Sequence, residues 1–523
     1  MNLLTDPLLR VTGGPGPRAM TLPQLLAALG RVEDLRLPGI QRHQEDAFHV
    51  FLCYLGGAIL ARRGCRDPVQ DEAFWCEGLR QLAGAAGDDA WSLVVADVAR
   101  PAFLQPPVAS AAQSGLSFTV ATPDRLDLLP TGRNHDVKRA RAARALPDEW
   151  VFALVSLQGM SGFYGTGNYG ISRMNGGYGS RPIIELVRTH GAGGRWRDAV
   201  LRLLDHRQQV LADPYGYDPH GLVLVWVEPW DGGQSLPLSR LDPFYLEVCR
   251  RVRLGVTASG LAAATLGAQA PRIHAKDLHG VVGDPWLPID LQGPAPAKAA
   301  DVRALTVSAR GFGADLLRRL LFGDGLRLSA LQRPATDWTG EVWLTASVLV
   351  RGEGTTEGFR EQEVRIPAPI RPRVFGPPAV RDPLNALCRS GIEVAAGMQR
   401  EVLWPAVRAL LTATEGPVPE RDSIRSWWRA LGTAFEHRWS DAFFPWLWSV
   451  PASADAQAAI ADWARLLRDA GLETLDRAAD TLPRHAGRRY RARVAAQRVF
   501  WRCLYGKFPF LREEVRDERT DPA

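Results

Sequence analysis

A glycine-rich stretch carries the first pattern with a chemical meaning. Residues 165–170 read GTGNYG, a literal G-x-G-x-x-G, inside the run SGFYGTGNYGISRMNGGYGS at 161–180. A dinucleotide fingerprint needs a strand before it, a helix opening on its last glycine, and an acidic residue about 20 positions later. Here a helical pattern precedes, a second glycine-rich segment follows, and Glu185 comes too early. The pattern favours an ordered loop whose glycines let a partner approach the backbone.

A short basic run provides the second candidate site. The sequence TGRNHDVKRARAAR at 131–144 is rich in cations and places Asn134, His135 and Asp136 next to one another. A His–Asp pair can serve a metal-dependent nuclease, but no second His or Cys pair lies nearby to complete a metal site. A histidine in a basic loop is more typical of phosphate contact. The nuclease interpretation, with His135 and Asp136, stays open as the weaker alternative.

The rest of the chain adds no catalytic signature. G-x-S-x-G, Walker A, H-E-x-x-H and paired-carboxylate patterns are absent from the sequence. Six cysteines are scattered without any C-x-x-C, and His274 and His279, at i, i+5 spacing, do not share one helical face. We therefore expect a protein that is not an enzyme, with no metal and no cofactor.

The two candidate sites lie on either side of one predicted helix. Proline and acidic residues open an apolar segment at 147–160, which is typical of a helix start. Further on, the sequence RGEGTTEGFRE at 351–361 follows a strand pattern and predicts the tip of a hairpin. Strand patterns occur at 221–228, 242–254, 342–351 and 363–370.

The character of the chain changes after a proline-rich run. The run RPRVFGPPAVRDP at 371–383 predicts a boundary, because proline breaks both helix and sheet. Helical periodicity then dominates at 384–415, 419–449, 453–480 and 484–505. The predicted fold class is α+β: a large mixed α/β domain over 1–375, followed by a C-terminal four-helix bundle over 380–523. Tryptophans cluster in this last part, and we expect them to pack the helices together.

Composition bounds the environment and the partners. The net charge of +6 and pI of about 9.1 permit a nucleic-acid surface without demanding one. The chain begins without a cationic segment followed by an apolar run, and it contains no apolar run of about 18 residues. We expect a cytoplasmic protein with reduced thiols and no membrane segment.

Several of these features together resemble one known family. The start MNLLTDPLLRV, the helix followed by GFYGTGNYG and then GSRPIIELVR, the hairpin RGEGTTEGFREQ and the helical carboxyl end occur in that order. This order is similar to that of the CasA family, the large subunit of the type I-E CRISPR surveillance complex, Cascade. The likeness covers nearly the whole chain, mainly as order and spacing.

The resemblance implies a DNA-recognition subunit of a ribonucleoprotein complex in antiviral defence. In that family the large subunit recognises the protospacer-adjacent motif (PAM) in double-stranded target DNA, mainly from the minor groove. A wedge then opens the duplex for pairing with the crRNA and R-loop formation, while base pairing reads the rest of the sequence. The implied partners are crRNA, target double-stranded DNA, the backbone, small and handle-binding Cascade subunits, and a recruited helicase-nuclease.

The resemblance also implies site residues. Those of the DNA-motif site are Gly162, Tyr164, Gly165, Gly167, Asn168 and Lys276. Those of the duplex wedge are Gly354, Thr355, Thr356 and Glu357. Those of the loop that meets the crRNA handle and neighbouring subunits are Arg133, Asn134, His135, Lys138 and Arg139.

The sequence departs from the family in two places and leaves two alternatives. It lacks the cysteine-rich zinc insertion of some relatives, and Thr and Glu occupy a wedge tip that is amide-rich in the best-known relative. Arg272 could supply the minor-groove cation in place of Lys276. An RNA-binding scaffold without duplex contact is the alternative from a different functional class.

Overall fold

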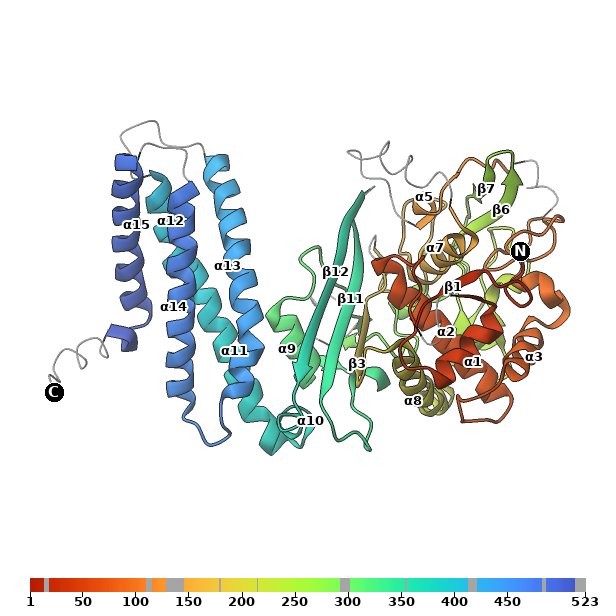
Figure 1. The fold of residues 1–523 in the computed structure, drawn as a ribbon, viewed down its shortest axis with the longest axis horizontal. Coiled ribbons are helices and arrows are strands. Elements are labelled where there is room, and N and C mark those ends of the chain that lie inside the picture. Colours follow the sequence, from red (N-terminus) through yellow and green to blue (C-terminus); the bar gives the residue numbers. More distant parts are fainter. Residues whose placement is uncertain are drawn as a thin grey trace. The chain divides into compact units, whose positions relative to one another are not determined.

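The computed structural model describes residues 1–13, 18–109, 115–127, 145–177, 180–213, 215–291, 302–352, 355–412, 421–481 and 486–512. The chain forms two compact units. Unit 1 comprises residues 1–313 and 323–365, and unit 2 comprises residues 314–322 and 366–523. Figure 1 traces helices and strands through unit 1 and helices through unit 2. This mixed α/β part followed by C-terminal helices confirms the predicted fold class.

Unit 1 is built around one buried helix. Helix α2 (Arg42–Arg62) is buried along most of its length and packs against α7 (Pro147–Met160) and α8 (Ala192–Ala212). After its polar first turns α2 is apolar on all sides, and α7 is buried over most of its length, as central helices must be. Gly56 and Gly57 of α2 let the rings of Trp196 in α8 and of Phe244 in β5 (Leu241–Leu246) approach, since a Cβ on either glycine would lie within 3 Å of a ring carbon. Among the described residues, unit 1 also contains the α-helices α1 (Leu22–Arg31), α3 (Glu72–Ala83) and α5 (Asp124–Asp127).

The strands of unit 1 form small sheets. The longest, in the order β12-β11-β3, joins the hairpin of β11 (Val342–Gly352) and β12 (Thr355–Ile366) to β3 (Ile183–Val187). A second has the order β10-β8-β9, with β8 Ile289–Asp290, β9 Arg303–Ala304 and β10 Leu326–Arg327. The pairs are β1 (Leu9–Val11) with β2 (Arg18–Met20), β4 (Leu222–Leu224) with β5 (Leu241–Leu246), and β6 (Arg251–Thr257) with β7 (Gly260–Leu266).

Unit 2 is helical in the part that the structure describes. Helices α11 (Pro378–Gly397) and α12 (Trp404–Thr412) are joined by a π-helical turn, Met398–Leu403, into one long segment. It packs with α13 (Arg421–Ser449), α14 (Ala456–Thr481) and α15 (Ala486–Lys507), which lie side by side in Figure 1. The short helices α9 (Ala314–Phe322) and α10 (Arg371–Phe375) complete the unit.

The prolines of 371–383 do not interrupt helical structure, contrary to what the sequence predicted. The stretch is mostly helical: it forms α10 and the start of α11. Pro372 and Pro378 occupy the first turns, where the missing N–H would have no helical partner in any case. Pro383 lies inside α11. Proline at the start of a helix therefore accounts for a pattern that resembles a linker.

Aromatic rings fill the bundle core, as expected. Trp446 and Trp463 stack with ring centroids 4.7 Å apart, and Phe443 packs edge-on against Trp463. The indole N–H of Trp463 donates to the Gly391 carbonyl at 2.9 Å. These buried rings join α11, α13 and α14, so they are occupied by packing and are not free for base stacking.

Candidate nucleic-acid interface

The glycine run forms a compact loop between α7 and β3. The Tyr164 N–H donates to the Asn168 carbonyl at 2.9 Å, and the Asn168 N–H donates to the Gly165 carbonyl at 3.0 Å. Gly165 and Gly167 have φ of 98° and 88°, a region that glycine adopts without steric cost. The turn therefore requires glycine at both positions for reasons internal to the chain.

The glycines of this loop differ in what surrounds them. A Cβ built on Gly165 would meet no atom within 4 Å, whereas a Cβ on Gly170 would lie 2.8 Å from the main-chain nitrogen of Phe163. Gly170 thus allows the loop to fold back on itself. Gly165 leaves open space over its backbone, which is the property expected where a partner comes close.

A buried arginine links two points in the first half of the loop. Arg250 donates from Nη2 to the Gly162 carbonyl at 2.8 Å and from Nη1 to the Tyr169 carbonyl. Its own backbone is fixed by Gln158 of α7, whose side-chain oxygen accepts from the N–H groups of Cys249 and Arg250 at 2.9 and 2.8 Å. Arg250 therefore fixes the separation between Gly162 and Tyr169 within the loop, a role that no pattern in the sequence predicted.

A second buried set fixes the part of the loop that follows. Glu247 accepts from the Ser172 N–H and hydroxyl, both at 2.7 Å, and pairs with Arg173 at 3.2 Å. The Arg173 guanidinium also lies 3.5 Å above the Tyr245 ring. Burial raises the pKa of Tyr245 well above its usual range, so its hydroxyl stays neutral beside Ser172. These charges hold the chain and are not offered to a partner.

The loop lies along one neighbouring segment, residues 267–280. The Ala268 N–H donates to the Gly167 carbonyl at 3.0 Å, and the Tyr169 hydroxyl donates to the Gln269 carbonyl at 2.8 Å. At the other end, a Cβ on Gly280 would lie 2.6 Å from the main-chain carbon of Met174. Both halves of the loop are thus in contact with the segment that carries Lys276.

Lys276 and Arg272 differ sharply within this segment. Lys276 is exposed on a short 3₁₀ turn, Lys276–Leu278. Arg272 is buried, 4% exposed, and donates to the carbonyls of Pro229, Val225 and Glu228 at 3.1 to 3.3 Å. Burial lowers the pKa of Arg272 to about 10. Arg272 therefore serves the interior of unit 1, which leaves Lys276 as the cation available to a partner in this segment.

The side chains of the glycine loop likewise divide into accessible ones and ones that are bonded within the fold. Tyr164 is 38% exposed and Asn168 is half-buried, so both are accessible. Tyr169 is half-buried and its hydroxyl is used within the fold, on Gln269. The structure brings the predicted motif residues together as one loop next to the Lys276 segment, although their role as a DNA site stays a prediction.

The predicted wedge lies at the end of the β11–β12 hairpin. Thr355, Thr356 and Glu357 belong to the first residues of β12, so they continue the strand, while Gly354 lies outside the described residues. Arg42 of α2 pairs with Glu361 of β12 at 2.6 Å, which ties the hairpin to the central helix. The wedge function of these residues stays a prediction.

The predicted crRNA-handle loop lies outside the described residues, with Arg133, Asn134, His135, Lys138 and Arg139 in it. The chain leading into it is described and firmly held. Asp127, the last residue of α5, is buried and accepts from Gln44 Nε2 at 2.9 Å and contacts His43 Nε2 at 2.8 Å. The chain is thus fixed to α2 just before this segment begins.

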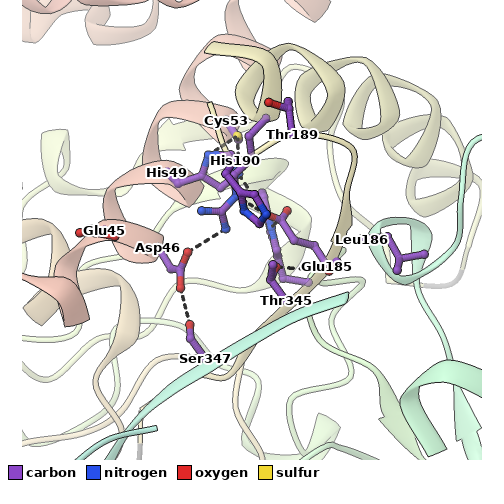
Figure 2. A network of polar contacts seen from close by, with 12 residues as sticks. Glu45, Asp46, His49, Cys53, Glu185, Leu186, Thr189, His190, Thr345 and Ser347 are labelled. Atoms are coloured by element: carbon purple, nitrogen blue, oxygen red, sulfur yellow. Dashed lines mark hydrogen bonds and ion pairs between the residues drawn. The ribbon is translucent and has the colours of Figure 1, made fainter. Parts of the chain in front are cut away.

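A buried polar network connects the hairpin to α2, β3 and α8. Figure 2 shows Asp46, His49 and Cys53 of α2 facing Glu185 of β3 and Ser347 of β11. Arg195 of α8 joins the network, with Nη2 2.7 Å from Asp46 Oδ1 and Nε donating to Glu185. The Ser347 hydroxyl donates to Asp46.

This network contains a thiol, an imidazole and a carboxylate, but not in a reactive state. Cys53 Sγ lies 3.6 Å from His49 Nε2, which lies 3.6 Å from Glu185 Oε1. Burial raises the pKa of the Cys53 thiol, while burial and the Arg195 charge lower the pKa of His49. A neutral thiol shut away from solvent is inert. The network is a structural connection between four elements.

Neither a metal cluster nor a membrane-spanning helix is found within the described ranges. No group of three or more His, Cys, Asp or Glu side chains is arranged to hold a metal ion there. Among the helices that the structure describes, none is long and apolar enough to cross a bilayer.

A row of exposed arginines runs along α15 in unit 2. Arg488, Arg491, Arg498 and Arg502 recur at helical spacing on one face, over about 21 Å of helix. None of the four has an ion-pair or hydrogen-bond partner in the part of the chain that the structure describes. In contrast, Arg493 on the same helix pairs with Asp476 and Asp480 of α14. We call these four residues the α15 arginine row.

Comparisons with known proteins identify the fold. No protein-family model matches the sequence, and neither does any curated protein. Among solved structures, CasA of Thermus thermophilus matches with a TM-score of 0.62 and 16% identity, covering 96% of this chain and 99% of that one. Cse1 of Thermobifida fusca matches at 0.64 and 15% identity (97% and 98%), and Cse1 of Acidimicrobium ferrooxidans at 0.61 and 16% identity (97% and 98%). The chain thus has the CasA (Cse1) fold along nearly its whole length, which confirms the resemblance predicted from the sequence.

Proposed function

We propose that this chain is the large subunit of a type I-E CRISPR Cascade complex and recognises the PAM in target double-stranded DNA. The observation that carries the proposal is that an open glycine turn lies next to a segment with an exposed lysine. Both belong to a chain that has the CasA fold along nearly its whole length. A fold alone does not assign a function, so the assignment rests on this site.

The chemistry of the site suits a DNA minor groove. The open backbone at Gly165 allows a close approach to the sugar–phosphate edge, and Tyr164 and Asn168 are accessible beside it. Lys276 brings one flexible cation, which fits the negative potential between the two phosphate chains. Few charges and much accessible backbone favour recognition of groove shape over a long list of base contacts.

Recognition would be coupled to opening of the duplex. The wedge residues Gly354, Thr355, Thr356 and Glu357 would separate the first base steps, each at a cost of a few kcal/mol, which motif binding partly offsets. Pairing of the opened strand with crRNA then proceeds as a nearly balanced exchange. Anchoring of β12 to α2 through Glu361 and Arg42 would give such a wedge a firm base.

The remaining surfaces would serve the assembly. The basic loop at 131–144 would meet the crRNA handle and neighbouring subunits, and the α15 arginine row supports contact of the bundle with small subunits and the displaced strand. The helicase-nuclease recruited to the opened target would supply the cleavage, so this chain itself would not be an enzyme.

A motif-library screen with the reconstituted complex tests the proposal. Duplexes carrying random sequence beside one protospacer are sorted by binding, and we expect enrichment of one short motif. Enrichment that disappears in the Lys276→Ala complex assigns recognition to this site. A flat library profile would overturn the proposal.

The nuclease alternative is tested separately. The isolated chain is incubated with duplex and single-stranded DNA in the presence of Mg²⁺, Mn²⁺ or Zn²⁺, next to the His135→Ala variant. We expect no cleavage by either protein. Cleavage that depends on His135 would replace the proposed function with a metal-dependent one.

A further inference from the structure

A cavity lies next to the turn that carries Lys276. It is a cavity of about 320 Å³ in unit 1, formed by the C-terminal part of α8, residues 280–289, and residues 327–333. Gly280, where a Cβ would lie 2.6 Å from the main-chain carbon of Met174, belongs to its wall. The cavity therefore lies next to the glycine run. Its volume is at the lower end of the range for small-molecule pockets, which suits one nucleotide.

The cavity has an excess of positive charge. Arg327 and Arg333 line it, and neither guanidinium has an ion-pair or hydrogen-bond partner within the described ranges of the chain. Two carboxylates also line it, but Asp284 is paired with Arg181 at 2.5 Å, which leaves Asp213 to oppose two arginines. Two unpaired guanidinium groups around one cavity favour a phosphate-bearing ligand.

The wall also offers an aromatic ring. Tyr215 is half-buried with its ring at the cavity. His206 donates from Nε2 to the Gly283 carbonyl at 2.9 Å, and its Nδ1 is buried, so this side chain supports the wall and is not open to a ligand. Burial lowers the pKa of His206 and outweighs the opposing effects of the Gly283 carbonyl, Asp284 and Gln209, so the imidazole is neutral. A half-buried aromatic ring beside two guanidinium groups fits a nucleobase together with its phosphates.

We propose that this cavity binds one unstacked nucleotide of single-stranded DNA. The base stacks on Tyr215, while Arg327 and Arg333 hold the adjacent phosphates. The proposal rests on the proposed function, because a duplex opened beside Lys276 supplies unpaired nucleotides at this place. A captured nucleotide cannot re-pair, so the cavity traps the opened state.

Photocrosslinking locates the nucleotide. A target duplex carries 5-iododeoxyuridine at each of the first displaced positions in turn and is bound to the complete complex, and the crosslinked residue is identified by mass spectrometry. We expect one position to crosslink to Tyr215. Crosslinks that map only elsewhere overturn the proposal, as does a crosslink to Tyr215 from 5-iodouridine in the guide RNA, which would make the ligand RNA.

Substitutions measure the contribution of each group. On a duplex with a pre-opened bubble beside the motif, Tyr215→Ala should weaken binding by roughly tenfold, because stacking on one ring is lost. Tyr215→Phe keeps the ring and should bind as the wild type does. Arg327→Glu with Arg333→Glu should weaken binding by at least about tenfold and reduce its salt dependence. Arg18→Glu with Arg36→Glu, at two exposed arginines beside β1, makes the same change in net charge and is the control; equal losses in all variants overturn the proposal.

A closed duplex separates failure of this proposal from failure of the proposed function. Initial motif binding on closed DNA should be unchanged in the Tyr215 and Arg327/Arg333 variants and lost in Lys276→Ala. If the wild-type complex has no motif preference but still crosslinks to Tyr215 on the bubble substrate, the proposed function fails and the nucleotide cavity stands. If motif preference is present while the Tyr215 variants bind the bubble normally, the cavity proposal fails alone.

Discussion

Arginine plays opposite roles in two regions of the molecule. Around the glycine loop, Arg173, Arg250 and Arg272 are buried and donate to carbonyls or a carboxylate of their own chain. Along α15, four arginines face solvent with no partner in the described part of unit 2. The same residue type thus builds the interior in one region and a phosphate-compatible surface in the other. In a chain with 63 basic residues, burial and pairing, rather than the count, identify the cations that a partner can reach.

The largest effect should come from the buried arginines. Arg173→Ala leaves Glu247 buried without its cation, so we expect a loss of about 3–5 kcal/mol in the free energy of unfolding. Chemical denaturation of the full chain measures it. Arg491→Ala on the arginine row is the matched control and should change stability by less than about 0.5 kcal/mol. Equal effects of the two substitutions would remove the distinction between the regions.

The next effect compares two cations within one segment. Lys276→Ala should weaken binding of motif-bearing duplex by roughly tenfold or more and leave the melting temperature unchanged, because the side chain is exposed. Arg272→Ala should do the reverse, since it leaves the buried Val225 carbonyl and two partly buried carbonyls short of a donor. Electrophoretic mobility shift and thermal denaturation together measure both. Loss of stability in Lys276→Ala would contradict the assignment.

The arginine row should act additively and depend on salt. Replacing its four arginines by glutamine one after another should lower the slope of log K against log salt for DNA binding by the complex, by about 0.7–0.9 for each arginine that neutralises a phosphate. Replacing Arg493, which is paired with Asp476 and Asp480, is the control and should leave the slope unchanged. A slope that stays constant through the series would show that the row meets a protein subunit.

The smallest effect should appear as a pH dependence of stability. Burial raises the pKa of Asp46 and Glu185, but the Arg195 charge and the hydrogen bonds from Ser347, His49 and Arg195 together outweigh it and hold both pKa values below their usual range. The folded state therefore gains stability above the unfolded pKa of about 4, and loses it as pH falls through the folded pKa. The lowered pKa of His49 acts in the same direction, with stability lost as pH falls below about 6.5. Between pH 7.5 and pH 5, the free energy of unfolding should decrease less in His49→Gln than in the wild type. An identical decrease in the two proteins would contradict this.

Local signals predicted the elements well where they agreed with the packing. Proline followed by two acids set the start of α7, and the structure begins that helix at Pro147. The strand predicted at 363–370 begins earlier, at Thr355, because pairing with the long β11 extends it, and it ends at Ile366 before two prolines. Tertiary pairing, which one sequence does not reveal, moved this boundary.

The candidate site was only half visible in the sequence. Glycine and lysine stand out by type, so the loop and Lys276 could be found. Arg250 and Glu247 could not be assigned, because a charged residue within an apolar strand pattern gives no sign of its partner. Such charges inside 242–254 are nevertheless a signal: a strand that carries them must pair them or expose them.

The contacts of the loop with residues 267–280 have a mechanical consequence. The Ala268 N–H is bonded to the Gly167 carbonyl and the Tyr169 hydroxyl to the Gln269 carbonyl, so the open backbone at Gly165 and the backbone of the segment that carries Lys276 are held against each other. On the proposed function, binding would therefore depend on the width of the minor groove, which is near 6 Å in B-form DNA. The site would then reject an A-form helix because of its groove width alone.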